Sequence, residues 1–264
     1  MQKIISWNVA GIRSRMDLLL ALLHEERPDY VFLQEIKADE NTFPFFELQM
    51  AGYESAIAGQ KSYNGVAILS PKRLHNVITA LPGFPETPDP QARFIQAQTD
   101  TGLTLINIYA PNGNPPMNAP GDTSRLTYKI KWYDALIAHL SGLVRADAKI
   151  VLGGDFNVIE KDTDVYNPDL YRHNAVMVPA IRDKFAQVCG LGLINCIRAF
   201  HPAPHTYSFW DFTGGCWPKN NGMLLDYFLV SPNLSKRLRN AGIHKEWRGR
   251  EKPSDHVPLF CLIS

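Results

Sequence analysis

The chain has 264 residues, of which 45% are hydrophobic and 20% charged, a composition typical of a globular soluble protein that buries a sizeable core. Its formal net charge of +1 excludes a global basic field, so a nucleic-acid partner would have to be attracted by local patches. No apolar run approaches the roughly 18 residues of a membrane span, which argues against a membrane partner.

The cysteines give no sign of a metal or disulfide framework. Cys189, Cys196, Cys216 and Cys261 form no CxxC pair, and none has a histidine at zinc-finger spacing. The first residues carry no basic stretch followed by an apolar one. We therefore expect a cytoplasmic protein with reduced thiols.

Short apolar runs rich in Val, Ile, Phe and Tyr alternate with longer segments of helical periodicity. In chain order, the pattern predicts a strand at 3–9, a helix at 14–28, strands at 29–35, 65–70, 93–99 and 103–111, a helix at 123–144, a strand at 149–158, a helix at 178–192, and strands at 225–231 and 257–263. Several strands alternate apolar and polar residues, which predicts sheets with one covered face.

The predicted helices carry boundary signals of their own. The first stops before Pro28, a residue that a helix interior does not accept. The longest is amphipathic and places Arg125, Lys129 and Lys131 at its polar positions. The third opens near Pro179 and ends on a Gly-rich stretch.

Three irregular stretches, at 85–93, 109–122 and 201–222, are long enough to be functional loops. The chain shows no repeat and no linker-like change of composition, so we expect one domain over residues 1–264. Strands outnumber helices, and hairpin-length connections mix with helical crossovers. This organisation predicts an α/β protein in which two packed sheets have helices outside them.

Polar side chains interrupt the predicted strands near their ends. These residues are Asn8, Glu35, Tyr109, Asn112, Asp155, Asn157, Asp226, Asp255 and His256. If the ends converge, the side chains form a site on rigid elements. Carboxylate and amide oxygens are the ligands that hard cations such as Mg²⁺ prefer, and the absence of cysteine among them argues against structural zinc.

Each of these residues also has a simpler interpretation. Asn8 and the GGDFN stretch suit turns, and Glu35 suits a solvated strand end. Asp226 lies in a probable core strand and needs a partner, which a salt bridge would supply. A lone histidine such as His256 is more often structural than catalytic. The joint pattern, rather than any single residue, favours a site.

The order of several motifs identifies a family resemblance over essentially the whole chain. These motifs are ISWNVAGIRSR, LQEIK, GVAILS, NIYAPNG, GGDFNV, TYSFWDF, LDYFLVS and EKPSDHVP. The chain resembles the exonuclease III-type apurinic/apyrimidinic (AP) endonucleases of the endonuclease/exonuclease/phosphatase superfamily. The resemblance implies a four-layer α/β (α+β) sandwich, in which two mostly antiparallel sheets pack face to face between flanking helices.

The resemblance also implies roles for the residues at the strand ends. It makes Glu35 the principal metal carboxylate with Asn8 beside it, and it assigns Asp155 to the attacking water. Tyr109 would contact the phosphate, and His256 would donate to a phosphate oxygen. The implied catalytic set is Tyr109, Asp155, Asn157, Asp226 and His256, and the implied ligands of Mg²⁺, with Mn²⁺ as a substitute ion, come from Asn8, Glu35, Asp155, Asn157, Asp255 and His256.

The adjacent Asp255 and His256 are not expected to be partners. In an extended segment, neighbouring side chains point to opposite sides, so Asp255 is poorly placed to orient the imidazole of His256. The resemblance gives that task to Asp226, whose carboxylate would raise the pKa of His256 and fix its tautomer.

The expected DNA contacts come from loops and helix ends. Arg93, Asn112, Arg125 and Lys129 are candidates for phosphate contacts, although each also suits a solvated surface. Trp210 and Phe212 resemble a pocket for a flipped-out abasic sugar, and an aromatic core cluster is the alternative.

These features predict a monomeric, Mg²⁺-dependent DNA-repair phosphodiesterase that acts on double-stranded DNA with abasic sites or damaged 3′ ends. It would cut 5′ to abasic sites, with 3′–5′ exonuclease or 3′-phosphatase activity besides. The alternatives are a 3′-end specialist, a phosphatase or lipid phosphodiesterase, and a non-catalytic DNA-binding relative. Substrate preference depends on the chain's departures from the family pattern at Leu224, Asn195, Ile197 and the loop around Cys216.

Overall fold

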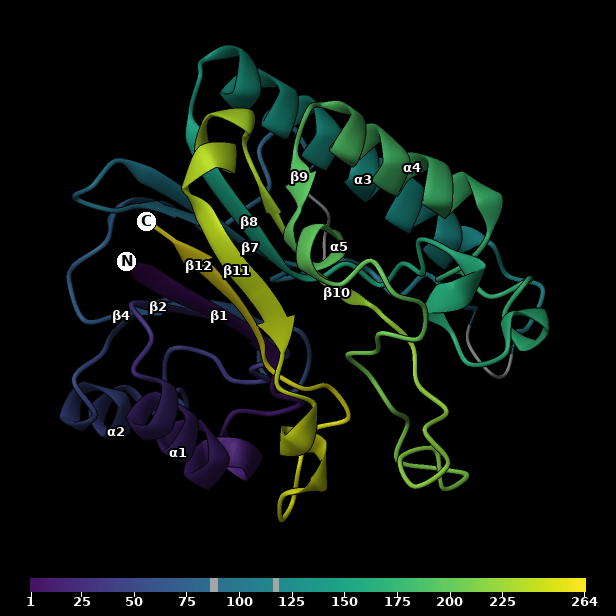
Figure 1. Cartoon of the computed structure of the whole chain (residues 1–264), viewed down its shortest axis with the longest axis horizontal. Helices are drawn as coiled ribbons and strands as arrows, with labels where there is room; N and C mark the ends of the chain where they lie inside the picture. The colour runs from purple at the N-terminus through teal and green to yellow at the C-terminus, as the bar shows by residue number, and fades with distance from the viewer. Residues whose placement is uncertain (86–89, 116–118) are drawn as a thin grey trace.

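The computed structural model describes residues 1–85, 90–115 and 119–264. These residues form two six-stranded sheets that face one another (Figure 1). Two of the long loops expected to be functional fall partly outside the described residues, at 86–89 and 116–118.

The first sheet has the strand order β11-β12-β1-β2-β4-β3 and the second β5-β6-β7-β8-β10-β9. The bounds in the first sheet are β1 Gln2–Asn8, β2 Tyr30–Gln34, β3 Glu54–Ala58, β4 Val66–Ser70, β11 Leu238–Ile243 and β12 Leu259–Ile263. Those in the second are β5 His75–Ile78, β6 Phe94–Gln98, β7 Leu103–Tyr109, β8 Lys149–Asp155, β9 Ile194–Asn195 and β10 Asp226–Val230.

Each sheet contains one parallel pair of strands, β1 with β2 and β7 with β8, and the other pairs are antiparallel. A parallel pair needs a crossover connection, and helices α1 and α3 supply the two crossovers. The prediction of two mostly antiparallel sheets is therefore confirmed.

Helices cover the outer faces of both sheets. Figure 1 shows α1 and α2 beneath the first sheet and α3 and α4 along the second. The helix bounds are α1 Met16–Glu26, α2 Phe45–Met50, α3 Ser124–Arg145, α4 Pro179–Gly190 and α5 Cys196–Phe200. Leucines of α1 pack with Ile5 and Trp7 of β1 in one core cluster, whereas Trp132 and Leu136 of α3 pack in another. The result is the expected four-layer sandwich.

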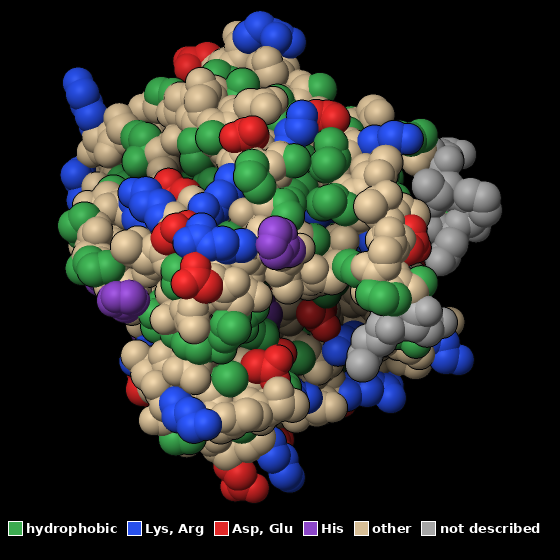
Figure 2. Space-filling view, turned by 90° about the vertical axis from the view of Figure 1, so that its right-hand side faces the viewer, with side chains coloured by type: hydrophobic (Ala, Val, Ile, Leu, Met, Phe, Trp, Pro, Cys, Tyr) green, Lys and Arg blue, Asp and Glu red, His purple; other side chains and the backbone are tan. Residues whose placement is uncertain are grey.

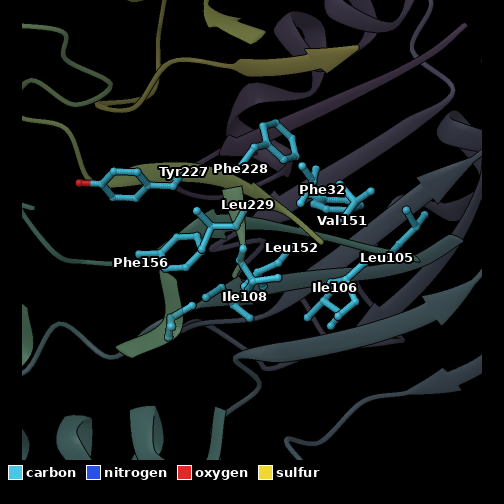
Figure 3. Close-up of a cluster of buried hydrophobic side chains, with 14 of the residues drawn as sticks. Phe32, Leu105, Ile106, Ile108, Val151, Leu152, Phe156, Tyr227, Phe228 and Leu229 are labelled. Atoms are coloured by element: carbon cyan, nitrogen blue, oxygen red, sulfur yellow. The ribbon is translucent and has the colours of Figure 1, made fainter. Parts of the chain in front are cut away.

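The inner faces of the two sheets pack through large side chains. Phe32 of β2 and Phe228 of β10 lie with ring centroids 5.9 Å apart, and Figure 3 shows these rings near one another in the buried cluster. Gly153 of β8 leaves room for them, because a Cβ there would lie 2.6 Å from the Phe228 ring and 3.0 Å from that of Phe32. The strand that leads to the GDFN motif is thus held close against both rings.

A buried polar link also joins the sheets. Asn107 of β7 donates its side-chain amide to the carbonyls of Leu33, at 2.9 Å, and Ala67, at 2.8 Å, in the other sheet. Gln34 donates to the Asn107 oxygen at 2.7 Å. Asn107 and Gln34 are fully buried, and the side-chain amide and oxygen of Asn107 both have hydrogen-bond partners, which favours one arrangement of the two sheets. This link therefore holds the relative position of the sheets just below the ends of β2 and β7.

Four strands were not predicted from the sequence pattern, namely β3, β5, β9 and β11. These strands form the edges of the two sheets, and all residues of β5 are exposed. Edge strands bury less apolar surface, so their hydrophobic signal is weak. Within the described part of the chain, no helix combines the length and apolarity that crossing a membrane requires.

Gly153→Ala tests the tight inter-sheet packing. The added methyl group should strain the two phenylalanine rings and lower the free energy of unfolding by about 1–3 kcal/mol, measured by urea denaturation. Gly142→Ala in α3 is the control, since a Cβ there meets nothing within 4 Å, and it should stabilise the protein by about 0.5–1 kcal/mol. Equal effects of the two substitutions would contradict the packing argument.

Candidate active site

The predicted strand ends do converge, because the sheet registers align them. Asp155 at the end of β8 lies opposite Tyr109 of the parallel strand β7 and opposite Asp226 of the antiparallel strand β10. In the other sheet, Asn8 at the end of β1 lies opposite Gln34, the residue before Glu35. Both sheets thus present polar side chains at the same end of the sandwich.

Asn8 connects the two sheets at this point. Its Nδ2 lies 3.1 Å from Glu35 Oε1 and 3.0 Å from Asp155 Oδ2, so one amide group donates to both carboxylates. Its Oδ1 accepts from the backbone N–H of Ala10 at 3.1 Å, which fixes the orientation of the amide. Asn8 is fully buried. Its role goes beyond that of a turn residue, because its side chain holds the two carboxylates together.

Glu35 lies in a left-handed backbone conformation with φ +49°, directly after β2. Its other carboxylate oxygen forms an ion pair with Lys37 at 2.9 Å. Burial opposes ionisation, but the charge and hydrogen bond of Lys37, with the hydrogen bond from Asn8, hold the pKa of Glu35 below its usual value. The carboxylate is therefore ionised at neutral pH. Lys37 was not singled out from the sequence, although the QEIK motif contains it.

Asp155 lies close to two other carboxylates of the site. Its carboxylate is buried, and burial together with the nearby charges of Asp226 and Glu35 raises its pKa to about 7, against the opposing effects of His256 and the backbone N–H of Asn157. A carboxylate whose pKa lies near neutrality is suited to exchange a proton with water.

His256 pairs with Asp226 and not with its neighbour Asp255. The Nδ1 of His256 lies 2.8 Å from Asp226 Oδ2, while its Nε2 lies 3.7 Å from Asp155 Oδ2. Burial alone would lower the pKa of His256, but the charges of Asp226 and Asp155 and the hydrogen bond to Asp226 raise it to about 10. The expected Asp226 partner is confirmed, and the imidazole is cationic at neutral pH.

Asp255 belongs to a separate set of contacts. Its carboxylate accepts from Ser254 Oγ at 3.2 Å, and its backbone carbonyl accepts from the N–H of Trp210.

Ser208 is a further partner of the Asp226–His256 pair, called the dyad below, and it was not predicted from the sequence. Its Oγ donates to Asp226 Oδ2 at 2.6 Å and accepts from the backbone N–H of Asp226 at 3.2 Å, so the carboxylate is held from two sides.

Asn157 lies in a tight turn behind Asp155. Its backbone N–H donates to Asp155 Oδ1 at 2.8 Å, and its side chain contacts Ala110 O and Asn112 Nδ2.

The predicted DNA contact of Lys129 requires a correction, because this residue is fully buried and donates to the carbonyls of Asn112, Asn157 and Ala175. Burial lowers its pKa to about 7. It therefore has no exposed ammonium group with which to contact a DNA phosphate.

The other expected phosphate-binding residues surround one cavity beside the site. Arg93, Asn112 and Arg125 line a cavity of about 600 Å³. The guanidinium of Arg93 stacks on the ring of Tyr109, 4.6 Å from its centroid. Burial and the charges of Glu35 and Asp155 keep the pKa of Tyr109 well above its usual range, so Tyr109 keeps its hydroxyl proton for donation.

The expected aromatic pocket is also corrected. Trp210 is fully buried and packs edge-on against Trp217, 5.0 Å away, so the aromatic-core interpretation holds for it. Phe212 is 54% exposed and remains free to contact a substrate. The ring of Phe209, which was not predicted from the sequence, packs against His256, with the two ring centroids 4.9 Å apart.

Two residues at which the chain departs from the family pattern have defined contacts. Leu224 is buried in the core, and its backbone N–H donates to the carbonyl of Asp164, whose buried carboxylate pairs with Arg198 of α5. Asn195 caps α5 by accepting from the backbone N–H of Arg198 at 3.1 Å, a role that Asn and Asp perform equally well.

The residues present fit a divalent metal ion. Asp155, Asp226 and His256 place ligand atoms within 4.8 Å of one another, but Asp226 and His256 already bind each other, so Asp155 is the member with free oxygen capacity. Glu35 is linked to Asp155 through Asn8. Burial is the main cause of the raised pKa of Asp155, and the nearby charges of Asp226 and Glu35 raise it further. An oxygen-rich, negatively charged set of donors suits a hard cation.

The surface around the site combines acidic and basic side chains. Figure 2 shows this face hollowed near its centre, with Asp or Glu side chains in the hollow and Lys and Arg side chains around it. The basic groups are local, as the net charge of +1 requires. A face of this kind attracts a polyanion to its rim and places the polyanion over the carboxylates.

The fold and the site together define a metal-dependent hydrolase of phosphate esters, and comparisons with known proteins agree. The family model described as "Endonuclease/Exonuclease/phosphatase family" matches residues 5–256. The chain is 32% identical to the exodeoxyribonuclease III of Haemophilus influenzae, with 98% of each chain covered. It superposes over 100% of both chains on a 3′ phosphatase from Neisseria bound to a product DNA hairpin, with TM-score 0.93 and 34% identity.

A third relative is an AP endonuclease from Archaeoglobus fulgidus, with TM-score 0.92 and 30% identity over 100% of both chains. The chain therefore belongs to the endonuclease/exonuclease/phosphatase family, and within it to the exonuclease III and AP endonuclease type.

Asp226→Asn tests the electrostatic support of His256. Without the Asp226 charge the pKa of His256 should fall from about 10. As the pH is raised, an activity that requires the imidazolium should therefore disappear at a lower pH in the variant than in the wild-type protein. We expect the alkaline limb of the pH profile of kcat/KM to move down by about one unit or more. Asp211→Asn, at an exposed carboxylate, is the control and should leave that limb in place. An unmoved limb in Asp226→Asn would refute the assignment.

Proposed function

We propose that the protein is a Mg²⁺-dependent DNA-repair nuclease that cleaves the DNA backbone 5′ to abasic sites and also processes damaged 3′ ends. The observation that carries the proposal is the buried group formed by Asn8, Glu35, Asp155, Asp226 and His256, which joins ionised carboxylates to a cationic imidazole across two sheets. The names of its relatives, an exodeoxyribonuclease III, a 3′ phosphatase and an AP endonuclease, support DNA as the substrate.

The chain's own residues divide the work of phosphodiester hydrolysis. Asp155, with its pKa near 7, takes a proton from the attacking water, and the turn that contains Asn157 holds that carboxylate in place. His256 keeps its positive charge next to Asp226 and donates from Nε2 to a phosphate oxygen. The Tyr109 hydroxyl donates to the same phosphate group. Donors that are fixed before the reaction stabilise developing charge without reorganisation.

Glu35 would be the main metal ligand, with Asp155 next to it and Asn8 orienting both. When bound, Mg²⁺ supplies charge neutralisation at the phosphate and at the leaving oxygen. Asp255 is half-buried and, among the described residues, its carboxylate has one hydrogen bond, from Ser254, so it would contribute through water.

One part of the DNA strand would lie along the polar cavity lined by Arg93, Asn112 and Arg125. Contacts of such residues with phosphates position the DNA backbone on the protein but do not recognise its base sequence. Phe212 is exposed, and the guanidinium group of Arg248 lies 5.0 Å from its ring. An exposed aromatic ring supported by a cation is suited to stack on a base.

One observation favours a second candidate, a 3′-end-processing enzyme with little AP endonuclease activity. Phe209, which contacts His256, packs with Val176, Met223 and Leu225 in one cluster, and these three are at most 6% exposed. A flipped-out sugar needs a pocket, whereas a terminal phosphate does not have to enter one. The filled surface beside His256 therefore favours terminal substrates.

We also propose that the protein acts as a monomer in the cytoplasm. Cell fractionation with a tagged chain, and light scattering of the purified protein with and without DNA, test these two points directly.

A comparison of substrates tests the main proposal. The protein is incubated with a duplex that contains one abasic analogue and with a duplex that carries a recessed 3′ phosphate, each with Mg²⁺ and with EDTA. We expect Mg²⁺-dependent product from both, and a fall of about 10²–10⁴-fold in Asp155→Asn and of similar size in Glu35→Gln. Asp134→Asn, at an exposed carboxylate of α3, is the control. Full activity in EDTA would overturn the proposal.

Met223→Ala tests which of the two candidate substrates the site prefers. Opening the cluster beside His256 should raise cleavage at the abasic analogue relative to 3′-phosphate removal by roughly tenfold or more. Met50→Ala, at a methionine that is 73% exposed, should leave the ratio unchanged. If Met223→Ala leaves the ratio unchanged while the protein stays folded, the filled cluster does not limit access to abasic sites.

A further inference from the structure

We propose that Lys129 and Tyr133 of α3 are positioning residues that fix the turn carrying Asp155 and Asn157. The inference rests on the proposed nuclease function, and it gives Lys129 a role in place of the DNA contact that its sequence position suggested. Lys129 and Tyr133 are fully buried and lie four residues apart, hence on the same side of the helix.

The ammonium group of Lys129 joins three separate segments. It donates to the carbonyl of Asn112 at 3.0 Å, of Asn157 at 2.6 Å and of Ala175 at 2.8 Å. An ammonium group has three protons, so each of them has one acceptor. Gly113 lets this side chain pass, because a Cβ at that position would lie 2.7 Å from Lys129 Cδ.

Tyr133 holds the neighbouring carbonyl of the same turn. Its hydroxyl donates to the carbonyl of Phe156 at 2.5 Å, next to the Asn157 carbonyl that Lys129 binds. Asn157 has φ +47°, a left-handed conformation that asparagine adopts more readily than other non-glycine residues. Two successive carbonyls of this turn are thus held by one face of α3.

The turn determines where Asp155 points. The backbone N–H of Asn157 donates to Asp155 Oδ1, while Asp155 Oδ2 receives the amide of Asn8. If the Lys129 contacts are lost, the carbonyls of Asn112, Asn157 and Ala175 lose their buried donor. The turn can then rotate so that the backbone N–H of Asn157 no longer points to Asp155. A misplacement of about 1 Å at a reacting group can cost about 10²-fold in rate.

The same helix also faces the substrate side. Ser124, Arg125 and Tyr128 at its N-terminal end line the cavity of about 600 Å³, and Lys129 follows directly. α3 therefore connects the wall of the proposed DNA-binding cavity with the catalytic turn through adjacent residues.

The test compares Lys129→Met with Tyr133→Phe and with Leu140→Ala. Leu140 is also a fully buried residue of α3, about three turns from Lys129, so its truncation destabilises the helix without touching the turn. We expect kcat to fall about 10²-fold in Lys129→Met and less in Tyr133→Phe, with KM nearly unchanged. Leu140→Ala should keep the wild-type kcat below its unfolding temperature.

A second readout needs neither metal nor substrate. Hydrogen–deuterium exchange of the metal-free protein should show faster exchange in a peptide spanning 153–160 in Lys129→Met than in wild type, and no such change in Leu140→Ala. If Lys129→Met does not fold, Tyr133→Phe carries both readouts, because it removes one hydroxyl and little volume.

The outcomes separate this inference from the proposed function. A wild-type protein that leaves both DNA substrates intact would refute the proposed function, while the exchange measurement would still test the turn. An active wild type with unchanged kcat and unchanged exchange in both Lys129→Met and Tyr133→Phe would overturn the positioning role. A rise in KM alone would also overturn it, since that result indicates a substrate contact.

Discussion

The site depends on keeping three carboxylates close together in a largely buried space. Asp155 lies between Glu35 and Asp226, and like charges at such distances repel strongly where water is excluded. The cations of Lys37 and His256 and the amide of Asn8 offset this repulsion only in part. Burial is the main cause that raises the pKa of Asp155 to about 7, and the charges of Asp226 and Glu35 add to it, whereas the charges of Asp226 and Asp155 raise the pKa of His256 to about 10. A divalent cation would offset the repulsion among the three carboxylates, and their oxygen-rich set of donors suits a hard cation.

A charged group of this kind needs a rigid support, and the sandwich supplies it through contacts between the sheets. Asn8 from β1 reaches Asp155 from β8 only because the sheets stand at a fixed separation. The rings of Phe32 and Phe228 set that separation with Gly153 beneath them, and the buried amide of Asn107 ties β7 to β2 and β4. The core is therefore part of the site, since a shift of one sheet would separate the amide from its carboxylates.

Much of this arrangement could be predicted from the sequence, and the failures share a physical cause. Apolar periodicity located the buried strands, and the polar residues at their ends identified Glu35, Asp155, Asp226 and His256, because a carboxylate in a core strand requires a partner. Lys129 was misassigned since helical periodicity places it among polar neighbours and does not show that three carbonyls lie beneath it. Trp210 was misassigned because an aromatic motif does not tell which ring faces inward. Both errors concern tertiary partners, about which local pattern carries no information.

The contacts of Asp164 show how the segment that leads into Asp226 is supported. Asp164 accepts from the backbone N–H of Lys161 and receives Arg198 from α5, whereas its backbone carbonyl accepts from the N–H of Leu224. Because an unpaired buried carboxylate would cost several kcal/mol, Asp164 needs a cation, and the apolar side chain of Leu224 cannot supply one. Arg198 provides this cation, so the backbone just before Asp226 is attached to a carboxylate whose charge is offset. The support of Asp226, and through it the charge on His256, consequently depends in part on α5.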